Sequence, residues 1–311
     1  MAKKEATRDA YGRALLALGE ARPDVVVLDA DLSKSTMTTH FALRYPDRFF
    51  NIGIAEQDLI STACGLALVG LKPFASTFAM FAVGRAFEQM RNDAAYASIP
   101  IVIAATHAGI TVGADGGSHQ AIEDIAITRV LPNMQVWVPA DGVEAYSMIT
   151  AAAEAAGPVY IRLGRHSVPQ VLPEDYSFIP GRAYVFPGGG DVSIIACGVM
   201  VAEALQAAAE LEAMGIGCRV INMGSIKPFD TEALRLAAQS RLVVTAEEHL
   251  LAGGLGSLVA EQLMQLHHRP QLLTIGIDDV FGQSGEPDEL MDHYGLRAAN
   301  IVEKVLSRLK P

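Results

Sequence analysis

Short runs of β-branched and other apolar residues alternate along the chain with longer stretches whose apolar positions recur at helical spacing. This alternation is typical of α/β proteins with mainly parallel sheets flanked by helices. In the first half it predicts helices from about residue 7 and at 56–69, 85–96 and 143–156. It predicts strands at 25–28, 49–52, 73–77, 101–106, 135–138 and 159–163.

The alternation stops between residues 169 and 190, where prolines and three consecutive glycines interrupt it. Because proline and glycine punctuate regular structure, we predict a linker at 171–190. It separates a first α/β domain at 1–170 from a second, smaller one at 191–311. The second domain is expected to contain strands at 192–196, 219–222, 242–246 and 272–277, and helices at 201–214, 231–238, 255–266 and 298–309.

Composition narrows the class of protein. The 311 residues are half hydrophobic, which is enough apolar material for two cores. With 24 Lys and Arg against 35 Asp and Glu, the net charge is −11, so we expect no nucleic-acid partner, although a local pocket for a phosphorylated small molecule is compatible with it. Three cysteines cannot build a disulfide framework. Without a membrane-length apolar run or a signal peptide, a cytoplasmic protein with no membrane partner is expected.

Polar residues gather directly after the apolar strands of the first domain. In open α/β sheets, ligands bind at the edge where the parallel strands end. Several titratable side chains aimed at one such edge indicate an active site. The residues that follow strands in this way are Asp31, Ser35, Glu56, His107, Asp115, His119 and Arg165.

Each of these features also has an ordinary structural explanation. Glu56 opens a helix with few charges, where a carboxylate either complements the helix dipole or, if buried, must be hydrogen-bonded or protonated. His107 and His119 bracket a glycine-rich loop and either cap it or face a ligand. Phe78 and Phe81 either belong to the core or stack on a flat heterocycle. A metal centre and a serine nucleophile are disfavoured, because the ligand spacings and the nucleophile elbow are missing.

Three further groups of residues fit more than one explanation. Arg8, Arg85, Arg91 and Arg165 are either solvated charges or fork-shaped donors for phosphate, and Arg165 closes a strand at the site edge. The glycines at 253–256 resemble a dinucleotide fingerprint without its full spacing, and close strand–helix packing explains them more simply. Residues 247–249, Glu-Glu-His, are interpreted as a loop or interface cluster.

Taken together, ordered blocks of the first domain resemble the pyrimidine-binding domain of transketolases. The second domain resembles the transketolase C-terminal domain, with less specific motifs. The blocks include Asp29-Ala30-Asp31-Leu32-Ser33, Gly53-Ile54-Ala55-Glu56-Gln57, Thr77-Phe78, Thr106-His107, Gly113-Ala114-Asp115-Gly116, Ser118-His119-Gln120 and Arg162-Leu163-Gly164-Arg165. The resemblance implies a thiamine diphosphate enzyme that transfers a two-carbon ketol unit from a ketose phosphate to an aldose acceptor.

The resemblance also implies roles for the residues that would contact the cofactor. Glu56 would hydrogen-bond the N1′ atom of the aminopyrimidine ring and is the expected catalytic residue together with His119, which would lie beside that ring and the substrate oxygens. Phe78 and Phe81 would pack on the pyrimidine. Asp31 matches an acidic residue near the cofactor bound by the neighbouring protomer.

A second set of positions would hold the substrate. Asp115 matches the acid that contacts a hydroxyl of the donor sugar, and His119 faces the same oxygens. A phosphate dianion needs several donors, so a complete set of matching positions argues for a phosphorylated sugar. The positions that match the phosphate-holding residues are Arg8, Ser35, His107 and Arg165.

Two departures from the family pattern matter. The Gly-Asp-Gly motif that introduces the diphosphate-binding domain does not occur in this sequence. We therefore expect the C-terminal half of a split transketolase, active only with a partner subunit that binds the diphosphate through Mg²⁺ or Ca²⁺, in an α2β2 assembly. Gly84 stands where many transketolases have a tyrosine beside the pyrimidine.

Three other functions are compatible with parts of this pattern. The β subunit of a 2-oxo acid dehydrogenase E1 is similar in length, but the Thr-His and Asp-Gly-Gly-Ser-His-Gln pattern favours sugar-phosphate transfer. A 1-deoxyxylulose-phosphate synthase-like enzyme is supported by residues 84–86 and 247–249. An inert assembly subunit is the alternative outside enzymes, and substitution of Glu56 would then leave turnover intact.

Overall fold

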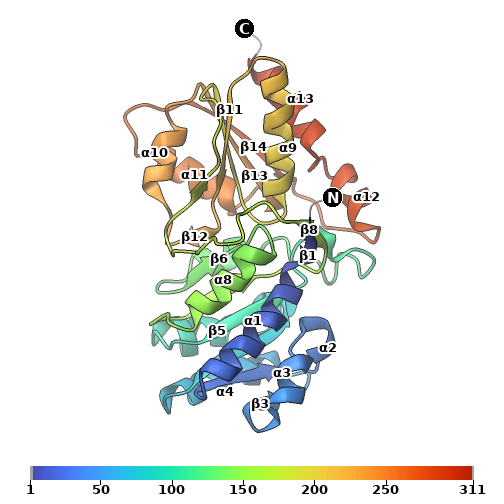
Figure 1. The fold of residues 1–311 in the computed structure, drawn as a ribbon, viewed down its shortest axis with the longest axis vertical. Coiled ribbons are helices and arrows are strands. Elements are labelled where there is room, and N and C mark those ends of the chain that lie inside the picture. Colours follow the sequence, from blue (N-terminus) through green and yellow to red (C-terminus); the bar gives the residue numbers. More distant parts are fainter. Residues whose placement is uncertain (1–2, 310–311) are drawn as a thin grey trace.

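The computed structural model describes residues 3–309, which form two sheet-and-helix units stacked end to end (Figure 1). The N-terminal unit is built on a seven-stranded sheet of order β12-β6-β7-β5-β4-β2-β3, in which only β12 is antiparallel to its neighbour. The C-terminal unit has a five-stranded sheet of order β14-β13-β10-β11-β9, in which β9 is antiparallel. The predicted architecture of mainly parallel sheets flanked by helices is confirmed.

The elements of the N-terminal unit follow the predicted alternation. Its strands are β2 (Val25–Asp29), β3 (Phe49–Asn51), β4 (Lys72–Phe78), β5 (Val102–Thr106), β6 (Gln135–Trp137) and β7 (Val159–Arg162). Its helices are α1 (Thr7–Ala21), α2 (Ser33–Thr36), α3 (Thr39–Arg44), α4 (Glu56–Leu68), α5 (Ala79–Arg85), α6 (Phe87–Gln89), α7 (Asp124–Arg129) and α8 (Gly142–Ala152). Two short 3-10 helices, η1 (Pro46–Arg48) and η3 (Ile110–Val112), and a π-helical segment, η2 (Met90–Tyr96), complete the unit.

The C-terminal unit contains the remaining elements, and a small antiparallel pair, β1 (Lys4–Ala6) with β8 (Ser167–Pro169), lies near the junction of the units. Its strands are β9 (Tyr184–Val185), β10 (Val192–Ala196), β11 (Cys218–Asn222), β13 (Leu242–Leu250) and β14 (Gln271–Ile277). Its helices are α9 (Met200–Ala213), α10 (Thr231–Ala237), α11 (Leu255–Leu263), α12 (Pro287–His293) and α13 (Ala298–Leu309). Strand β12 (Ser225–Lys227) comes from this part of the chain but pairs with β6 of the other sheet.

Strand β2 shows why continuous apolar runs form the centre of these sheets. All five of its residues are buried. Successive side chains of a strand point to opposite faces, so a strand covered on both faces needs apolar residues throughout. Val27 packs with Tyr11 of α1 on one face, whereas Val26 packs in the cluster that contains Leu59 of α4 on the other. Helices α1 and α8 lie against each other on the first of these faces (Figure 1).

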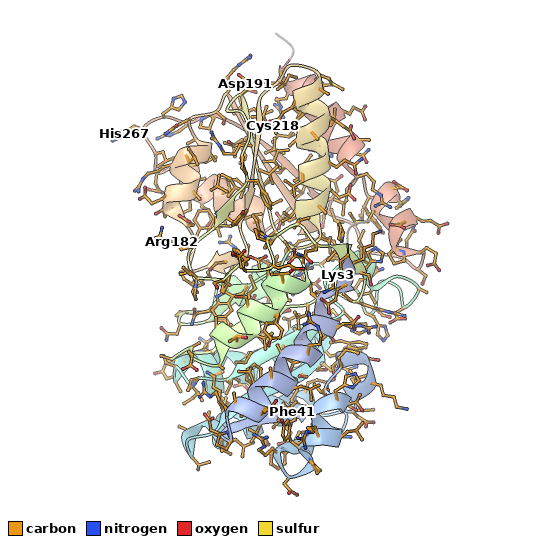
Figure 2. All side chains as sticks on the ribbon, viewed as in Figure 1. Lys3, Phe41, Arg182, Asp191, Cys218 and His267 are labelled. Atoms are coloured by element: carbon orange, nitrogen blue, oxygen red, sulfur yellow. The ribbon has the colours of Figure 1, made fainter. Side chains whose placement is uncertain are left out.

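The apolar packing is continuous across the junction of the two units. One cluster contains Leu59 of α4 and Ile103 of β5 together with Ile195 of β10 and Leu255 of α11. Figure 2 shows that side chains fill both units, with Phe41 inside the lower unit and Cys218 inside the upper one, and both residues are buried. Because these apolar side chains are buried across the joint, the hydrophobic effect holds the units together as well as stabilising each one.

Several predicted boundaries differ from the structure. Residues 171–190, predicted as a linker, contain β9, which joins the C-terminal sheet. The helix predicted at 85–96 begins earlier, as α5, and continues through α6 into the π-helical segment η2. Residues 247–249, interpreted as a loop or interface cluster, do not form a loop, because they lie inside β13 and are buried. Glu248 and His249 do contact the N-terminal unit, through Thr111 and Ala126. Helix α12 was not predicted, although its proline at the first turn and its capping box of Glu286 and Glu289 are recognisable start signals.

None of the helices found between residues 3 and 309 is long and apolar enough to cross a membrane.

Candidate active site

The predicted site residues lie at the edge of the large sheet where its parallel strands end. Strands β2, β4, β5 and β7 run parallel and in register, so the segments that follow them emerge side by side. These segments begin with Ala30, Ala79, His107 and Leu163. The open edge of a parallel sheet is the usual place for a ligand in this architecture.

Four aromatic rings form a compact cluster at this edge. Phe78, the last residue of β4, stacks on Phe81 with ring centroids 5.5 Å apart and on His107 with centroids 3.8 Å apart. His119 meets Phe81 edge-on at 5.3 Å. Phe78 is buried, whereas Phe81 and His119 are half-buried. The two phenylalanines therefore do not belong only to the core, because their outer ring and His119 are accessible to a flat ligand.

His107 sits in a conformation that non-glycine residues rarely adopt. Its φ is +57°, and its side chain is buried at the end of β5. The Nε2 atom accepts a hydrogen bond from Nη1 of Arg8 at 3.1 Å, because a guanidinium group can only donate. Nδ1 then carries the ring hydrogen and lies 3.0 Å from Oγ1 of Thr106. Unusual backbone conformations of this kind concentrate at functional sites.

The surroundings of His107 keep its imidazole neutral. Burial lowers its pKa to about 3, and the positive charges of Arg8 and Arg165 and the neighbouring His119 act in the same direction. His107 is therefore a hydrogen-bonding group without a charge at neutral pH. An unfolded histidine binds a proton near its ordinary pKa.

We expect the ring of His107 to show no titration above pH 5. Because the unfolded state takes up a proton that the folded state does not, this group costs about 1.4 kcal/mol of stability for each pH unit below ~6.5. The measurement is the pH dependence of histidine ring resonances in selectively labelled protein, with His107→Gln used for assignment. A His107 midpoint close to pH 6.5 would contradict the described environment.

Two arginines lie on the same edge as His107. Nη1 of Arg8 also donates to the backbone carbonyl of Ser35 at 3.0 Å, so Ser35 contributes its main chain to this contact. Nη1 of Arg165 donates to both carboxylate oxygens of Asp115 at 3.2 Å and to the carbonyl of Val112 at 3.1 Å. Burial lowers the pKa of Arg8, the negative charge of Asp9 raises it, and the positive charge of Arg165 lowers it. The two guanidinium groups are therefore close enough to repel each other electrostatically. Such a pair suits a phosphate dianion.

Glu56 is the first residue of α4, and its side chain is only 3% exposed. This burial excludes the explanation that it is a solvated acid at an exposed helix end. Its Oε1 atom accepts a hydrogen bond of 2.9 Å from Nη1 of Arg85. The Arg85 guanidinium carbon lies 4.0 Å from the centroid of the Phe81 ring, so the ion pair rests on the aromatic cluster. Glu56 is thus hydrogen-bonded to an arginine that also contacts Phe81, and Phe81 in turn packs on His119.

Asp31 stands apart from the other predicted residues. It is exposed after β2, has a φ of +63°, and accepts a hydrogen bond of 3.0 Å from Nδ2 of Asn51. Within residues 3–309 its hydrogen-bond partners do not include the aromatic cluster or the arginines. The role predicted for Asp31 at a neighbouring protomer stays a prediction.

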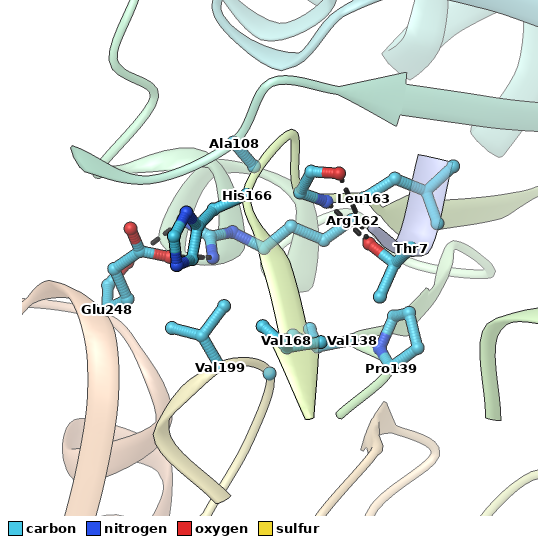
Figure 3. A pocket seen from close by; sticks show the side chains of 12 residues that line it. Thr7, Ala108, Val138, Pro139, Arg162, Leu163, His166, Val168, Val199 and Glu248 are labelled. Carbon is cyan, nitrogen blue, oxygen red and sulfur yellow. Dashed lines mark hydrogen bonds and ion pairs between the residues drawn. The ribbon is translucent and has the colours of Figure 1, made fainter. Parts of the chain in front are cut away.

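A buried ion-pair network beneath the site edge was not predicted from the sequence. Nε of Arg162, the last residue of β7, donates to both carboxylate oxygens of Asp124 at 3.0 and 2.9 Å. Its Nη2 donates to the carbonyls of Ala121 and Glu248, each at 3.0 Å. Figure 3 shows Arg162 directed toward Glu248 across the junction of the two units. The sequence contained a sign of this network, because Arg162 directly follows an apolar strand run and charged residues are almost never buried unpaired.

Figure 3 also shows a small cavity between these residues, lined by Thr7, Arg162, His166, Val199 and Glu248 among others. Its volume is about 20 Å³, which is room for about one water molecule. The cavity is too small for a sugar or a cofactor. Among residues 3–309, no group of three or more His, Cys, Asp or Glu side chains is arranged to hold a metal ion.

Comparison with known proteins identifies relatives over nearly the whole chain. Residues 3–170 match the family described as the transketolase pyrimidine binding domain, and residues 181–301 match the transketolase C-terminal domain. A putative transketolase C-terminal section from Methanocaldococcus jannaschii is 46% identical, covering 97% of this chain and 96% of that protein. A 6-deoxy-6-sulfo-D-fructose transketolase subunit from Clostridium sp. is 40% identical over 95% of this chain and 92% of its own.

A solved structure described as a split gene transketolase, inactive beta4 tetramer, has the same fold. It superposes with a TM-score of 0.90 at 54% identity and covers 97% of both chains.

Proposed function

The chain belongs to the transketolase family, and we propose that it is the subunit of a split transketolase that contributes the pyrimidine-binding half of each active site. In this proposal it transfers a two-carbon ketol unit from a ketose phosphate to an aldose or aldose phosphate. The observation that carries the proposal is the buried carboxylate of Glu56, which is joined through Arg85 to the ring of Phe81 and so to the aromatic cluster with His119 and His107. Arg8 and Arg165 lie at the same sheet edge, next to His107.

The residues present fit the pyrimidine half of thiamine diphosphate. Glu56 offers a buried carboxylate for a ring nitrogen, and Phe78 and Phe81 offer aromatic surface for a flat ring. When bound, this cofactor supplies a carbanion-forming carbon that amino acid side chains cannot provide. Glu56 would hold and move the proton at the ring nitrogen. Arg85 now occupies one oxygen of Glu56, but its side chain is 48% exposed and can move aside.

The arginines and histidines would bind and orient the sugar phosphate. The guanidinium groups of Arg8 and Arg165 supply positive charge, and the neutral ring of His107 accepts a hydrogen bond from Arg8 and so holds that guanidinium group in place. Asp115, held by Arg165, would accept a hydrogen bond from a substrate hydroxyl. His119 is half-buried on the aromatic cluster, and its Nδ1 lies 3.0 Å from Oγ of Ser118, which orients its ring. In this position it could exchange a proton with a substrate oxygen.

The proposal includes a partner subunit that carries the diphosphate-binding domain and its Mg²⁺ or Ca²⁺ ion. No Gly-Asp-Gly motif occurs in the 311 residues. The similar split gene transketolase is described as inactive when it is a beta4 tetramer, which supports a need for a second chain. We propose that the two kinds of subunit form an α2β2 assembly. We also propose that this assembly is cytoplasmic, because the three cysteines are buried and free, as expected in a reducing compartment.

Ketol transfer should require this chain, the partner subunit and thiamine diphosphate together. The test is co-expression with a subunit containing the diphosphate-binding domain, followed by an assay with a ketose phosphate donor and an aldose phosphate acceptor. Each chain alone and the complex without cofactor are the controls. Transfer by this chain alone, or without thiamine diphosphate, would refute the proposal.

The same complex separates the proposal from its rivals. Pyruvate turnover in place of ketol transfer would assign the chain to a 1-deoxyxylulose-phosphate synthase-like enzyme or a 2-oxo acid dehydrogenase E1. The two arginines beside His107 favour a sugar phosphate as substrate and so argue against the 2-oxo acid dehydrogenase E1, because a 2-oxo acid carboxylate carries only one charge. A 1-deoxyxylulose-phosphate synthase also handles a sugar phosphate, so pyruvate turnover decides that case.

A further inference from the structure

The loop that carries Asp115 and His119 contacts the C-terminal unit in two places, while Asp115 itself stays exposed. We call residues 109–120 the site loop. It contains four glycines, at 109, 113, 116 and 117, so its own sequence restricts its backbone very little. A loop of this kind samples many conformations unless other contacts select one. The C-terminal unit supplies such contacts at the base of the loop and at its tip.

At the base, Glu248 of β13 fastens the loop. Its Oε1 atom accepts a hydrogen bond of 2.7 Å from the backbone N–H of Thr111. Gly109 lies against the same carboxylate, and a Cβ atom at this position would overlap it. Glu248 is buried, and its Oε2 atom is 3.8 Å from Nη1 of Arg162. The carboxylate is therefore fixed between a cation from β7 and an N–H group of the site loop.

At the tip, residues 282–285 fit against the loop backbone. A Cβ atom on Gly117 would lie 2.5 Å from the carbonyl oxygen of Gly282, and one on Gly116 would lie 2.5 Å from Oγ of Ser284. Nε2 of Gln120 donates to the carbonyl of Gln283 at 3.0 Å and to that of Ile110 at 3.1 Å. Gln120, the last residue of the site loop, is thus bonded both to Ile110 near the start of the loop and to the C-terminal unit.

Gly117 distinguishes this contact from ordinary turn chemistry. The glycines at 109, 113 and 116 have positive φ angles, which alone would favour glycine. The φ angle of Gly117 is not positive in this way, so its backbone conformation does not by itself call for glycine. Glycine is required at this position by the carbonyl of Gly282, because a Cβ at 2.5 Å from a backbone atom forces one of the two segments to move.

We propose that the C-terminal unit sets the conformation of the site loop, with Glu248 and residues 282–285 as positioning elements for Asp115 and His119. Neither Glu248 nor this segment needs to touch substrate. The catalytic consequence rests on the proposed function, whereas the structural part concerns this chain alone. Placing reacting groups in advance is worth a large factor in rate, and a displacement of about 1 Å can cost ~10²-fold.

The structural part is tested with Gly117→Ala in the full chain. Gly157→Ala is the matched control, because its Cβ would meet only the carbonyl of Asn133 at an ordinary 3.7 Å. We expect hydrogen–deuterium exchange of peptides within residues 109–120 to be about ten-fold faster in Gly117→Ala and unchanged in Gly157→Ala. Glu248→Ala should also loosen the base of the loop, and Glu248→Gln, which keeps an acceptor oxygen, should restore most of the protection. Wild-type exchange in both Gly117→Ala and Glu248→Ala would overturn the proposal.

The catalytic part is tested in the assembled complex with its partner subunit. Gly117→Ala is expected to lower kcat/KM for the ketose phosphate by about 10- to 100-fold, while the Kd for thiamine diphosphate stays within about two-fold. A merely structural defect would weaken cofactor binding and substrate use together, and that result would contradict the positioning role. If the wild-type complex shows no ketol transfer, the proposed function fails, and the exchange experiment still decides the structural part.

Discussion

Replacing Glu56 with glutamine is expected to lower kcat for ketol transfer in the assembled complex by about 10²- to 10⁴-fold, the usual contribution of a positioned proton-transfer group. Glutamine has the same size and can still accept a hydrogen bond from Arg85. It cannot take up or release a proton at the cofactor ring. The measurement is steady-state ketol transfer at saturating cofactor, with Glu20→Gln as control, because Glu20 is an exposed acid at the far end of α1.

The variant must assemble for this result to count, so size-exclusion chromatography should show the same complex as the wild type. Glu56 has a half-exposed partner, and its loss leaves Arg85 in contact with water rather than buried. We therefore expect little change in thermal unfolding. Turnover within about ten-fold of the wild type would favour the inert assembly subunit over the proposed role.

The second large effect concerns stability. Replacing Arg162 with methionine is expected to reduce the free energy of unfolding by about 3–5 kcal/mol, because it leaves buried carboxylates without their cation. Asp124 is fully buried and Arg162 is 6% exposed, so water cannot take the place of the lost partner. Tyr160 OH, at 2.8 Å from Oδ2 of Asp124, offers only one hydrogen bond in compensation. Urea unfolding at neutral pH gives the value.

A double variant identifies the cause of this loss. Arg162→Met combined with Asp124→Asn removes both charges, and we expect it to be more stable than Arg162→Met alone. If the single variant loses less than about 1 kcal/mol, the pair behaves like an exposed surface salt bridge and the described burial is wrong.

Much of the N-terminal unit was predictable because its strands are buried on both faces. Runs such as residues 101–106 contain only apolar and small residues, and the structure places β5 at this position with every residue buried. The position of the site was predictable for the same reason, since parallel strands must end at a common edge. The sequence therefore indicated where His107 and Arg165 would lie.

The partners of these residues were not predictable from the sequence. Arg85 was interpreted as a solvated charge or a phosphate ligand, but it pairs with Glu56, which is 29 positions away. Arg85 is the last residue of α5, and the π-helical η2 that follows α6 departs from the 3.6-residue periodicity. Hydrophobic periodicity reports burial and gives no information on which distant side chain meets a given charge.

The charged residues of β13 show the same limit. Glu247 and Glu248 end an apolar run, which suggested a loop. Both are buried inside the strand, because Glu247 accepts backbone hydrogen bonds from Leu255 and Gly256 at the start of α11 and Glu248 meets Thr111. A charge inside a strand is tolerated only when tertiary contacts satisfy it. The close packing predicted for the glycines at 253–256 agrees with the structure, since a Cβ at Gly254 would overlap Glu247.

In the proposed function, the buried carboxylate of Glu56 governs proton movement on the pyrimidine ring of thiamine diphosphate. The most direct test of this role is the rate of hydrogen–deuterium exchange at C2 of thiamine diphosphate in the assembled complex, followed by NMR after rapid acid quenching. We expect fast exchange in the wild-type complex and a rate close to that of the free cofactor in Glu56→Gln. Equal exchange rates in the two complexes would contradict it.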